Sequence, residues 1–306
     1  MSSTANPTTC TLCGGTCALR FHEVVDPQTR EDFQIFACSS CGHARTWPAP
    51  AVMDRYYGKQ YYGGRHGWTA EYCALRRLRL VTKLSGRGNG RRLLDIGCGD
   101  GTFLTKAKRH GWEVMGTEMN PEIARKAGLD VYKSLDEAAE RGPFDCITLW
   151  HVLEHFTNPL TQLESIGTLL GPEGVLVIAV PDAEGGQARF FGRKWFHLDV
   201  PRHLHHFGKH SLELHLSKTG FAVERVWYGE FEYDLFGWSQ SALNCLLRDP
   251  NVFFEILTGR DVLSGSAKRS AHLLLGSLFC VLTLLPTWWG MATGRAGTLI
   301  MAAKKA

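Results

Sequence analysis

Two pairs of cysteines near the N-terminus have the spacing of a metal site. Two residues separate Cys10 from Cys13 and Cys38 from Cys41, and a glycine follows each pair. Four thiolates on two tight turns can enclose a tetrahedral Zn²⁺, and the glycines let backbone N–H groups approach the sulfur atoms. A set of four thiolates leaves no open position, so we expect a structural metal. The alternative is an accidental cluster without metal, and Cys17 is a spare thiol nearby.

A glycine-rich loop has the place of a nucleotide-type site. It lies between the apolar run Leu93–Ile96 and an expected helix over 102–110, with glycine at positions 97, 99 and 101. A nicotinamide dinucleotide site would have G-x-G-x-x-G, but Thr102 stands where its last glycine would be. That fingerprint brings a helix N-terminus onto a pyrophosphate. The loop found here, preceded by Asp95, lets the backbone approach an amino-acid tail and a sulfonium instead.

An acidic residue follows at the distance expected for a ribose contact. Glu118 lies 21 residues after Gly97, at the end of the expected strand 113–117. A carboxylate there can accept hydrogen bonds from both ribose hydroxyls. Folds that bind NAD share this acid, so it does not distinguish the two cofactors by itself.

Alternating strands and helices must position these residues. This rhythm indicates an α/β fold with a parallel, doubly wound sheet, whose ligands bind at the carboxyl ends of the strands. Asn120 is the expected N-cap of a helix over 121–127, with Pro121 at its first position. The expected strands of this sheet are 93–96, 113–117, 131–133, 144–150, 175–180, 221–228 and 297–304. Before the sheet, strands over 18–25 and 32–37 are expected around a turn near Asp26.

Three segments resemble a known family. Leu94–Phe103 resembles motif I of class I S-adenosylmethionine (SAM)-dependent methyltransferases, and Phe144–His155 resembles their fourth-strand motif in the subgroup of ubiquinone-type O-methyltransferases. Trp195–Phe207 is similar to the segment after strand five of that subgroup. The N-terminal cysteine segment is similar to the zinc ribbon of deoxysugar C-methyltransferases. The resemblance implies a seven-stranded Rossmann-like methyltransferase sheet with an N-terminal zinc ribbon.

The resemblance also implies roles for the residues above. Glu118 would hold the SAM ribose, and Met119 would pack on the adenine. His151 would lie near the reacting methyl group, and Glu154 and His155 are expected to start a helix. The residues expected to line the SAM tail are Asp95, Gly97, Gly99 and Gly101.

Methyl transfer needs an aligned acceptor, and a base when the acceptor is an O–H or an acidic C–H. Alignment can supply several kcal/mol of such a barrier, and histidine suits proton transfer near neutral pH. The candidate bases are His151, His203, His205 and His206, of which His203 and His206 match the family segment best. Arg189 and Arg202 are among the basic residues that either bind an anionic acceptor or form a solvated face.

An apolar segment of about 65 residues precedes the last expected strand. No Asp, Glu, Lys or Arg occurs from Ser270 to Gly294, and Lys268, Arg269 and Arg295 flank this stretch. Pro286 limits the clean apolar run to about 14 residues, which suits an interfacial segment better than a span. We expect an apolar helical insertion whose hairpin enters a membrane face over 270–294, or else a helix buried in the protein or in a dimer.

Composition sets the remaining limits. The 306 residues are 44% hydrophobic and 21% charged, as in globular proteins, and a net charge of +4 is too small to indicate a nucleic-acid partner. The N-terminal residues 1–9 do not resemble a signal peptide, so we expect a cytoplasmic protein, at the inner face of a membrane if 270–294 makes contact. The expected domains are a zinc ribbon over 1–47, a connector and helix over 48–90, a SAM-binding core over 91–230, the insertion over 231–295 and a final core strand over 296–306.

The function expected from the sequence is SAM-dependent methyl transfer to a small-molecule acceptor. The acceptor would be a sugar or polysaccharide precursor or a lipid-linked metabolite, with C- and O-methylation both open. The alternatives are a non-catalytic SAM-binding or membrane-associated scaffold and a nucleic-acid methyltransferase. The oligomeric state is not predicted.

Overall fold

The computed structural model describes residues 7–57, 68–258 and 266–306. The chain forms two compact units, each assembled from three segments. One, here called the ribbon unit, comprises Met1–Gly63, Pro181–Leu212 and Tyr228–Leu299. The other, here called the sheet unit, comprises Gly64–Val180, Glu213–Trp227 and Ile300–Ala306. Part of the expected connector, residues 58–67, lies outside the described residues.

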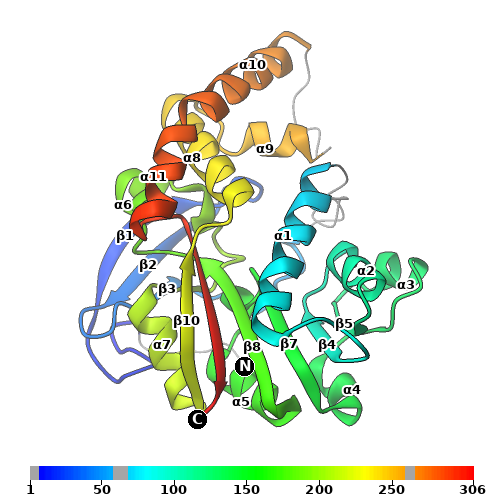
Figure 1. The fold of residues 1–306 in the computed structure, drawn as a ribbon. Helices are drawn as coiled ribbons and strands as arrows, with labels where there is room; N and C mark the ends of the chain where they lie inside the picture. The colour runs from blue at the N-terminus through cyan, green and yellow to red at the C-terminus, as the bar shows by residue number, and fades with distance from the viewer. Residues whose placement is uncertain (1–6, 58–67, 259–265) are drawn as a thin grey trace. The chain divides into compact units, whose positions relative to one another are not determined.

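A seven-stranded sheet forms the centre of the sheet unit (Figure 1). Its strand order is β10-β11-β8-β7-β4-β5-β6, and β4 pairs in parallel with both β5 and β7. The chain order therefore reverses next to β4, as a doubly wound sheet requires. This confirms the predicted fold class. The strands are β4 (Arg92–Ile96), β5 (Glu113–Thr117), β6 (Val131–Tyr132), β7 (Phe144–Trp150), β8 (Leu170–Pro181), β10 (Phe221–Tyr228) and β11 (Thr298–Lys305).

Helices cover this sheet. Its central strands are therefore buried, and their sequences are almost wholly apolar. Leu93 and Ile147 are fully buried, and Leu78 of α1 and Leu104 of α2 belong to the core of this unit. Strands that are buried on both faces read as continuous apolar runs, as β4 and β7 do. The helices are α1 (Trp68–Ser85), α2 (Thr102–Arg109), α3 (Glu122–Lys126), α4 (Leu135–Ala138) and α5 (Pro159–Leu169), with 3₁₀ turns at Ala139–Arg141 and Leu153–His155. Helix α7 (Lys209–Lys218) has residues in both units.

The predicted N-cap of α3 is wrong. The cap position is Pro121, and its side chain makes no capping hydrogen bond. Asn120 is instead part of the loop that follows β5, where its N–H donates to Glu118 Oε1 at 3.3 Å. By contrast, Asn158 does cap α5, since its side chain accepts the Thr161 N–H at 3.5 Å.

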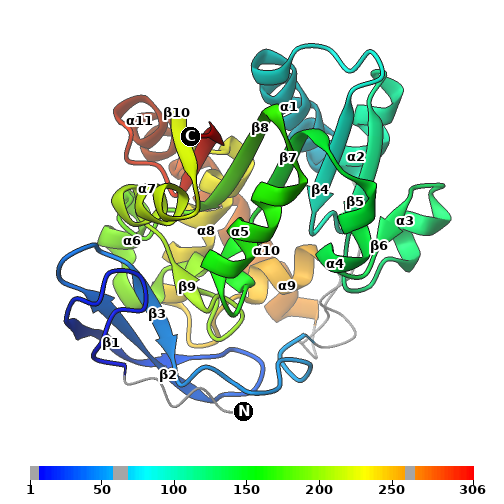
Figure 2. The same ribbon diagram turned by 90° about the horizontal axis from the view of Figure 1, so that it is seen from below.

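A second, four-stranded sheet belongs to the ribbon unit. Its strands are β1 (Cys17–Val25), β2 (Asp32–Cys38), β3 (Ala44–Trp47) and β9 (His205–His206), in the order β1-β2-β3-β9 (Figure 2). The β1–β2 hairpin turns at Asp26, whose N–H donates to the Glu31 carbonyl at 2.9 Å, so the two predicted strands and their turn are confirmed. The pairing of β9 with β3 joins Arg45 to His205, a placement that the sequence did not indicate.

The segment before the last strand is helical, as predicted. It forms α8 (Phe231–Leu246), α9 (Val252–Leu257), α10 (Ser266–Leu282) and α11 (Leu284–Thr293), and α6 (Gly186–Phe191) lies in the same unit. Asp234 of α8 is fully buried and its carboxylate accepts N–H groups from Glu230, Gln187 and Gly297. Burial raises the pKa of Asp234 to about 7, against the effect of these hydrogen bonds. The network holds α8 against α6 and the residues that lead into β11.

The prediction of a hairpin for this segment is wrong, because α10 and α11 form a bent pair. The two helices meet at Thr283 with a bend of 43°. The Thr283 hydroxyl donates to the Phe279 carbonyl at 2.6 Å, a contact that tends to bend helices. Pro286 falls in the first turn of α11, where its missing N–H costs no intrahelical bond. The chain therefore continues in a new direction instead of turning back.

Candidate active site

The glycine-rich loop connects β4 to α2 at the carboxyl edge of the sheet. Gly97 and Gly99 have φ values of +70° and +58°, a region that favours glycine. A Cβ on Gly97 would also lie 2.5 Å from the Val152 side chain. The N–H groups of Gly97 and Cys98 both donate to the Thr117 carbonyl at the end of β5, at 2.8 and 3.0 Å. The loop thus folds over the edge where β4 and β5 end.

Glu118 closes this loop from the neighbouring strand. The Gly99 N–H donates to Glu118 Oε2 at 3.0 Å, so the two sequence features expected to bind SAM do lie together. Met119, the next residue, is 63% exposed, which leaves its side chain accessible to a ligand. The sheet unit therefore brings a glycine-rich backbone loop, a carboxylate and an exposed apolar side chain to one edge.

Asp95 lies beneath the loop at the end of β4. It is buried, and its Oδ1 accepts the Thr148 hydroxyl of β7 at 2.6 Å. Burial raises the pKa of Asp95 to about 7, although the Thr148 hydrogen bond and the charge of Arg77 act in the opposite direction. The Arg77 guanidinium stacks on Trp150 at 4.7 Å from the ring centroid. Sequence reasoning missed Thr148 and Arg77, although a threonine inside the apolar run 144–150 was a visible signal.

His151 directly follows β7 on the same edge. Its φ is +58° and its N–H donates to the Ala179 carbonyl of β8 at 2.9 Å. Its Nδ1 lies 3.8 Å from Oε1 of the buried Glu154. Glu154 and His155 form the 3₁₀ turn Leu153–His155, in agreement with their expected place at a helical start. A left-handed backbone conformation at a non-glycine residue is a feature of functional sites. His151 has it beside the carboxyl edge of the sheet, where ligands of doubly wound folds bind.

His203, His205 and His206 belong to the ribbon unit. His206 Nε2 lies 3.0 Å from the Thr46 hydroxyl, and burial together with the charge of Arg20 lowers the pKa of His206 to about 3. His203 Nδ1 contacts the His197 carbonyl at 2.9 Å. All three rings are buried, and each contacts a residue of the same unit, His43 in the case of His205.

Arg202 is also buried, and it forms ion pairs. Its guanidinium donates to Asp26 Oδ1 at 3.0 Å and to Asp199 Oδ1 at 2.6 Å, and its side chain is only 4% exposed. The two expected roles of Arg202, in a solvated face or in binding an anionic acceptor, are therefore wrong. It instead ties the β1–β2 turn to the segment before β9.

The four predicted cysteines form one cluster. Their Sγ atoms all lie within 4.8 Å of one another, with 3.6 Å between Cys10 and Cys41 and 3.5 Å between Cys13 and Cys38. Zinc–sulfur bonds of about 2.3 Å in a tetrahedron place sulfur atoms about 3.8 Å apart, so the geometry fits zinc. Cys17 is outside this group, and burial raises its pKa to about 11.

Tight turns present these thiols. The N–H of Gly14 donates to the Cys10 carbonyl at 2.9 Å, and that of Gly42 donates to the Cys38 carbonyl at 3.0 Å. Burial raises the pKa of Cys38, but N–H groups of Cys41 and Ser40, together with the thiols of Cys13 and Cys41, outweigh it and lower the value to about 6. The thiolate form that zinc binds is therefore favoured at Cys38.

Comparison with known proteins decides the family. Residues 65–226, more than half of the 306 residues, match a family model described as a methyltransferase domain. A ubiquinone biosynthesis O-methyltransferase of Aeromonas salmonicida is 30% identical over 161 residues, which cover 48% of this chain and 68% of that protein. The chain belongs to the methyltransferase-domain family. The SAM-dependent methyltransferase predicted from the three motifs is thereby confirmed at the level of the family.

Other similarities are either shorter or lower in sequence identity. A ubiquinone biosynthesis O-methyltransferase of Xanthomonas campestris pv. campestris is 33% identical over 102 residues, which cover 29% of this methyltransferase and 43% of that enzyme. A SAM-dependent methyltransferase of Archaeoglobus fulgidus of known structure is 18% identical, with a TM-score of 0.47, and the match covers 83% of this chain and 97% of that one.

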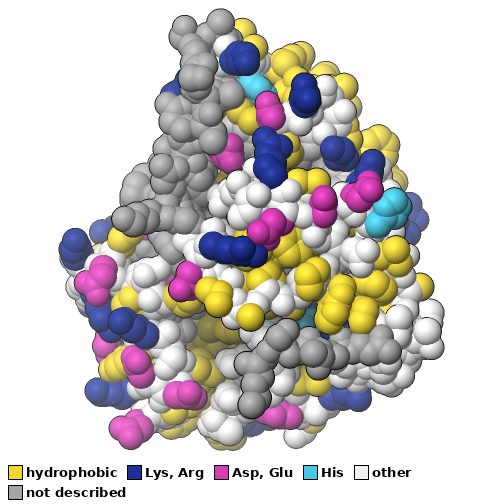
Figure 3. Space-filling view, turned by 180° about the vertical axis from the view of Figure 1, so that it is seen from behind, with side chains coloured by type: hydrophobic (Ala, Val, Ile, Leu, Met, Phe, Trp, Pro, Cys, Tyr) yellow, Lys and Arg dark blue, Asp and Glu magenta, His cyan; other side chains and the backbone are white. Residues whose placement is uncertain are grey.

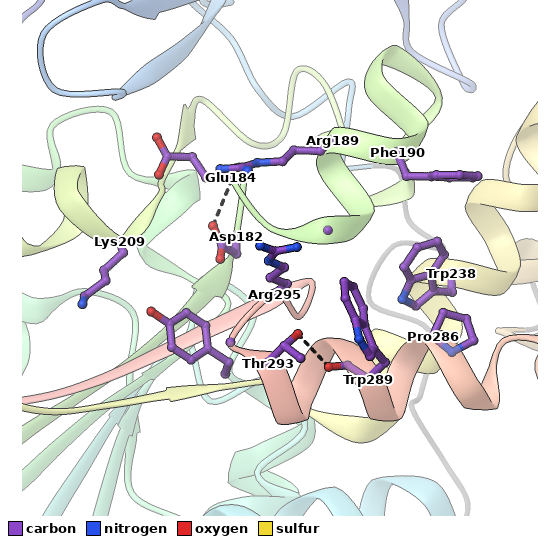
Figure 4. A pocket seen from close by; sticks show the side chains of 13 residues that line it. Asp182, Glu184, Arg189, Phe190, Lys209, Trp238, Pro286, Trp289, Thr293 and Arg295 are labelled. Atoms are coloured by element: carbon purple, nitrogen blue, oxygen red, sulfur yellow. Dashed lines mark hydrogen bonds between the residues drawn. The ribbon is translucent and has the colours of Figure 1, made fainter.

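The ribbon unit of the methyltransferase also contains a pocket of about 650 Å³ (Figure 4). Aromatic and apolar side chains, among them Phe190, Trp238 and Trp289, line one part of it, and the rings of Phe190 and Trp238 pack at an angle of 52° with 5.7 Å between their centroids. Burial raises the pKa of Asp182, which accepts the Glu184 N–H at 3.0 Å, to about 6. The charged lining residues are Asp182, Glu184, Arg189, Lys209 and Arg295. The pocket can therefore hold a molecule with both an apolar and a polar part.

Proposed function

We propose that this methyltransferase binds SAM at the carboxyl edge of β4, β5 and β7 and transfers its methyl group to a small-molecule acceptor. The observation that supports this most directly is the hydrogen bond from the Gly99 N–H to Glu118, at 3.0 Å, across the end of β5. It places a loop whose left-handed backbone favours glycine next to the carboxylate that would hold the ribose. A scaffold without cofactor needs neither feature.

The residues of this edge have distinct proposed tasks. Bound SAM would supply a methyl group on a sulfonium with its leaving group built in. The loop glycines Gly97, Gly99 and Gly101, together with Asp95, would bind the amino-acid tail of SAM. Glu118 would exchange its bond to the Gly99 N–H for the ribose hydroxyls, and Met119 would cover the adenine. The chain must then orient the acceptor and exclude water, since the chemical step itself needs little further help.

We propose His151 as the first candidate for the base that removes an acceptor proton. It directly follows β7, the strand beside β4, and it belongs to the same unit as the glycine loop. His206 and His203 remain further candidates from the sequence. The low pKa of His206, about 3, makes its ring a weak proton acceptor, which favours His151.

The acceptor that we propose is a sugar or polysaccharide precursor or a lipid-linked metabolite. The similar proteins of Aeromonas and Xanthomonas are named as O-methyltransferases of ubiquinone biosynthesis, which favours an oxygen as the methylated atom. C-methylation, as in the family that the ribbon resembles, is the second possibility. The cysteine cluster would hold a structural Zn²⁺ and take no part in the transfer.

Calorimetric titration of the zinc-loaded protein with SAM and with S-adenosylhomocysteine tests the cofactor site. We expect binding of both, and at least about tenfold weaker binding of SAM to Glu118→Ala, because two charge-assisted hydrogen bonds are lost. Glu122→Ala is the matched control, since this acid of α3 is exposed and pairs only locally with Arg125 at 3.7 Å. Unchanged affinity of Glu118→Ala in a folded protein would contradict the ribose assignment, and absence of binding in the parent would contradict the enzyme.

A further inference from the structure

Two consecutive helices of the ribbon unit carry large apolar side chains that face away from the protein. The exposed residues of α10 recur at intervals of three and four, so they follow one face of the helix, and α11 continues the series. Leu274 is 73% exposed, Leu285 is 81% exposed and Trp288 is 68% exposed. We call this face the apolar strip: Leu274, Leu275, Leu278, Val281, Leu282, Leu284, Leu285, Trp288 and Trp289.

The opposite face of the same helices is already packed. A Cβ on Gly276 of α10 would overlap the ring of Phe253 of α9, so the two helices are in close contact there. Thr283 and Ser239 of α8 join their hydroxyls at 3.0 Å. The strip is therefore a second apolar face, beyond the one that the fold uses. Scattered exposed leucines are ordinary on protein surfaces, but a continuous patch of this kind marks an interaction site.

Charges are arranged around the strip and not within it. The sequence from Ser270 to Gly294 contains no Asp, Glu, Lys or Arg, whereas Lys268 and Arg269 precede it and Arg295 follows it. The Arg295 guanidinium lies 5.6 Å from the centroid of Trp289. On the face of the molecule that Figure 3 shows, exposed hydrophobic side chains lie among basic ones.

The pocket next to α11 is lined by three basic residues and by two acids, Asp182 and Glu184. Trp289 and Pro286 belong to its lining, and so do Arg189, Lys209 and Arg295. Of its two acids, Asp182 is buried and accepts a backbone N–H, as described above. Apolar side chains, a pair of tryptophans and flanking basic residues are the side-chain types that meet the acyl region, the interface and the anionic headgroups of a bilayer.

The lengths of the helices indicate contact with one leaflet. Among the described helices none is by itself both long and apolar enough for a span, and Lys268–Leu282 and Leu284–Thr293 reach that length only when counted together across their bend. A two-fold dimer on this face would be a poor alternative. Both ends of the strip are basic, so like charges would meet whichever way the paired helices ran.

We propose that the apolar strip docks the protein on the surface of a bilayer that contains anionic lipids, with α10 and α11 lying in the headgroup region. This inference does not depend on methyl transfer. Burial of one leucine contributes at least roughly tenfold to the partition, and the basic residues add an attraction that salt weakens.

Co-sedimentation with vesicles tests the proposal. We expect the protein to sediment with vesicles of phosphatidylcholine and phosphatidylglycerol, and less with phosphatidylcholine alone or at high salt. The double variant Leu278→Ser with Leu285→Ser should lose roughly a hundredfold or more in partition, since two leucines no longer insert. Leu19→Ser is the matched control, because Leu19 is a 48% exposed leucine on β1 of the same unit.

Three results would overturn the proposal. The first is a parent protein that stays in the supernatant with both kinds of vesicle. The second is a double variant that sediments as the parent does, and the third is a parent dimer in sedimentation velocity that the double variant dissociates. SAM binding and thermal melting report separately whether each variant is folded. Trp288→Ser, a smaller change on the same strip, repeats the comparison if the double variant unfolds.

Discussion

Replacement of Asp95 by asparagine should weaken SAM binding. It should also make the stability of the protein depend less on pH. The carboxyl of Asp95 is buried between β4 and β7, and its pKa rises from 3.8 to about 7 for that reason. An acid whose pKa is raised on folding stabilises the protein below its unfolded pKa, and this contribution is lost as the pH rises through the folded pKa. The parent should therefore lose stability between about pH 4 and pH 7 through this group.

The size of the effect follows from the two pKa values. A shift of one unit corresponds to about 1.4 kcal/mol, and between pH 5 and pH 8 the two values give a loss of about 3 kcal/mol as an upper estimate. The amide introduced by Asp95→Asn would keep an oxygen for the Thr148 hydroxyl, now 2.6 Å from Asp95, but carries no charge to bury. The variant should lose less stability than the parent over this range.

Denaturant unfolding of parent and Asp95→Asn at pH 5 and pH 8, without SAM, measures this difference directly. Asp182 and Asp234 also have raised pKa values, but their contribution cancels when the two proteins are compared. Calorimetry should show weaker SAM binding by the variant. Equal losses of stability in the two proteins would refute the account of Asp95 as a buried charge.

Three further substitutions test other parts of the structure. Cys38→Ser should release the bound zinc and loosen the ribbon, whereas Cys17→Ser should keep the parent stoichiometry in a metal assay; equal zinc in both would contradict the site. Arg202→Met should destabilise the protein by about 3–5 kcal/mol in thermal or denaturant unfolding, since it leaves the buried Asp26 carboxylate without its cation; a loss below about 1 kcal/mol would count against this pair. Gly97→Ala should lower the free energy of unfolding by about 1–3 kcal/mol, because alanine would have to adopt a φ of +70°. It should also weaken SAM binding. Parent-like values in both assays would show that the loop rearranges freely.

Local patterns predicted much of the fold and of the cofactor edge. The apolar runs that became β4, β5 and β7 are covered on both faces, and such strands need no long-range information to be recognised. The left-handed backbone of one short loop favours glycine at 97, 99 and 101. The domain boundaries predicted from sequence stay a prediction, and the two compact units are each assembled from separated segments.

Apart from the local cap at Asn120, the errors and omissions concern residues whose roles depend on tertiary contacts. Arg202 reads as one more basic residue in a basic segment, yet Asp26, 176 residues away, makes it a buried ion pair. Thr148 gains its role from Asp95 on the next strand. The direction of the chain after α10 depends on a side-chain bond at Thr283 and on packing against α8, which hydropathy does not contain.

By itself, the sequence determined the chemistry that the chain can offer: four thiols in two pairs, a glycine loop with an acid on the following strand, and a charge-free stretch bounded by basic residues. These are properties of neighbouring residues, since spacing and backbone demands act over a few positions. Tertiary structure alone decided that Glu118 reaches Gly99, that His206 is buried and neutral, and that one face of α10 is left bare. Each of these depends on which surfaces exclude water, and that is settled only when segments far apart in the chain pack together.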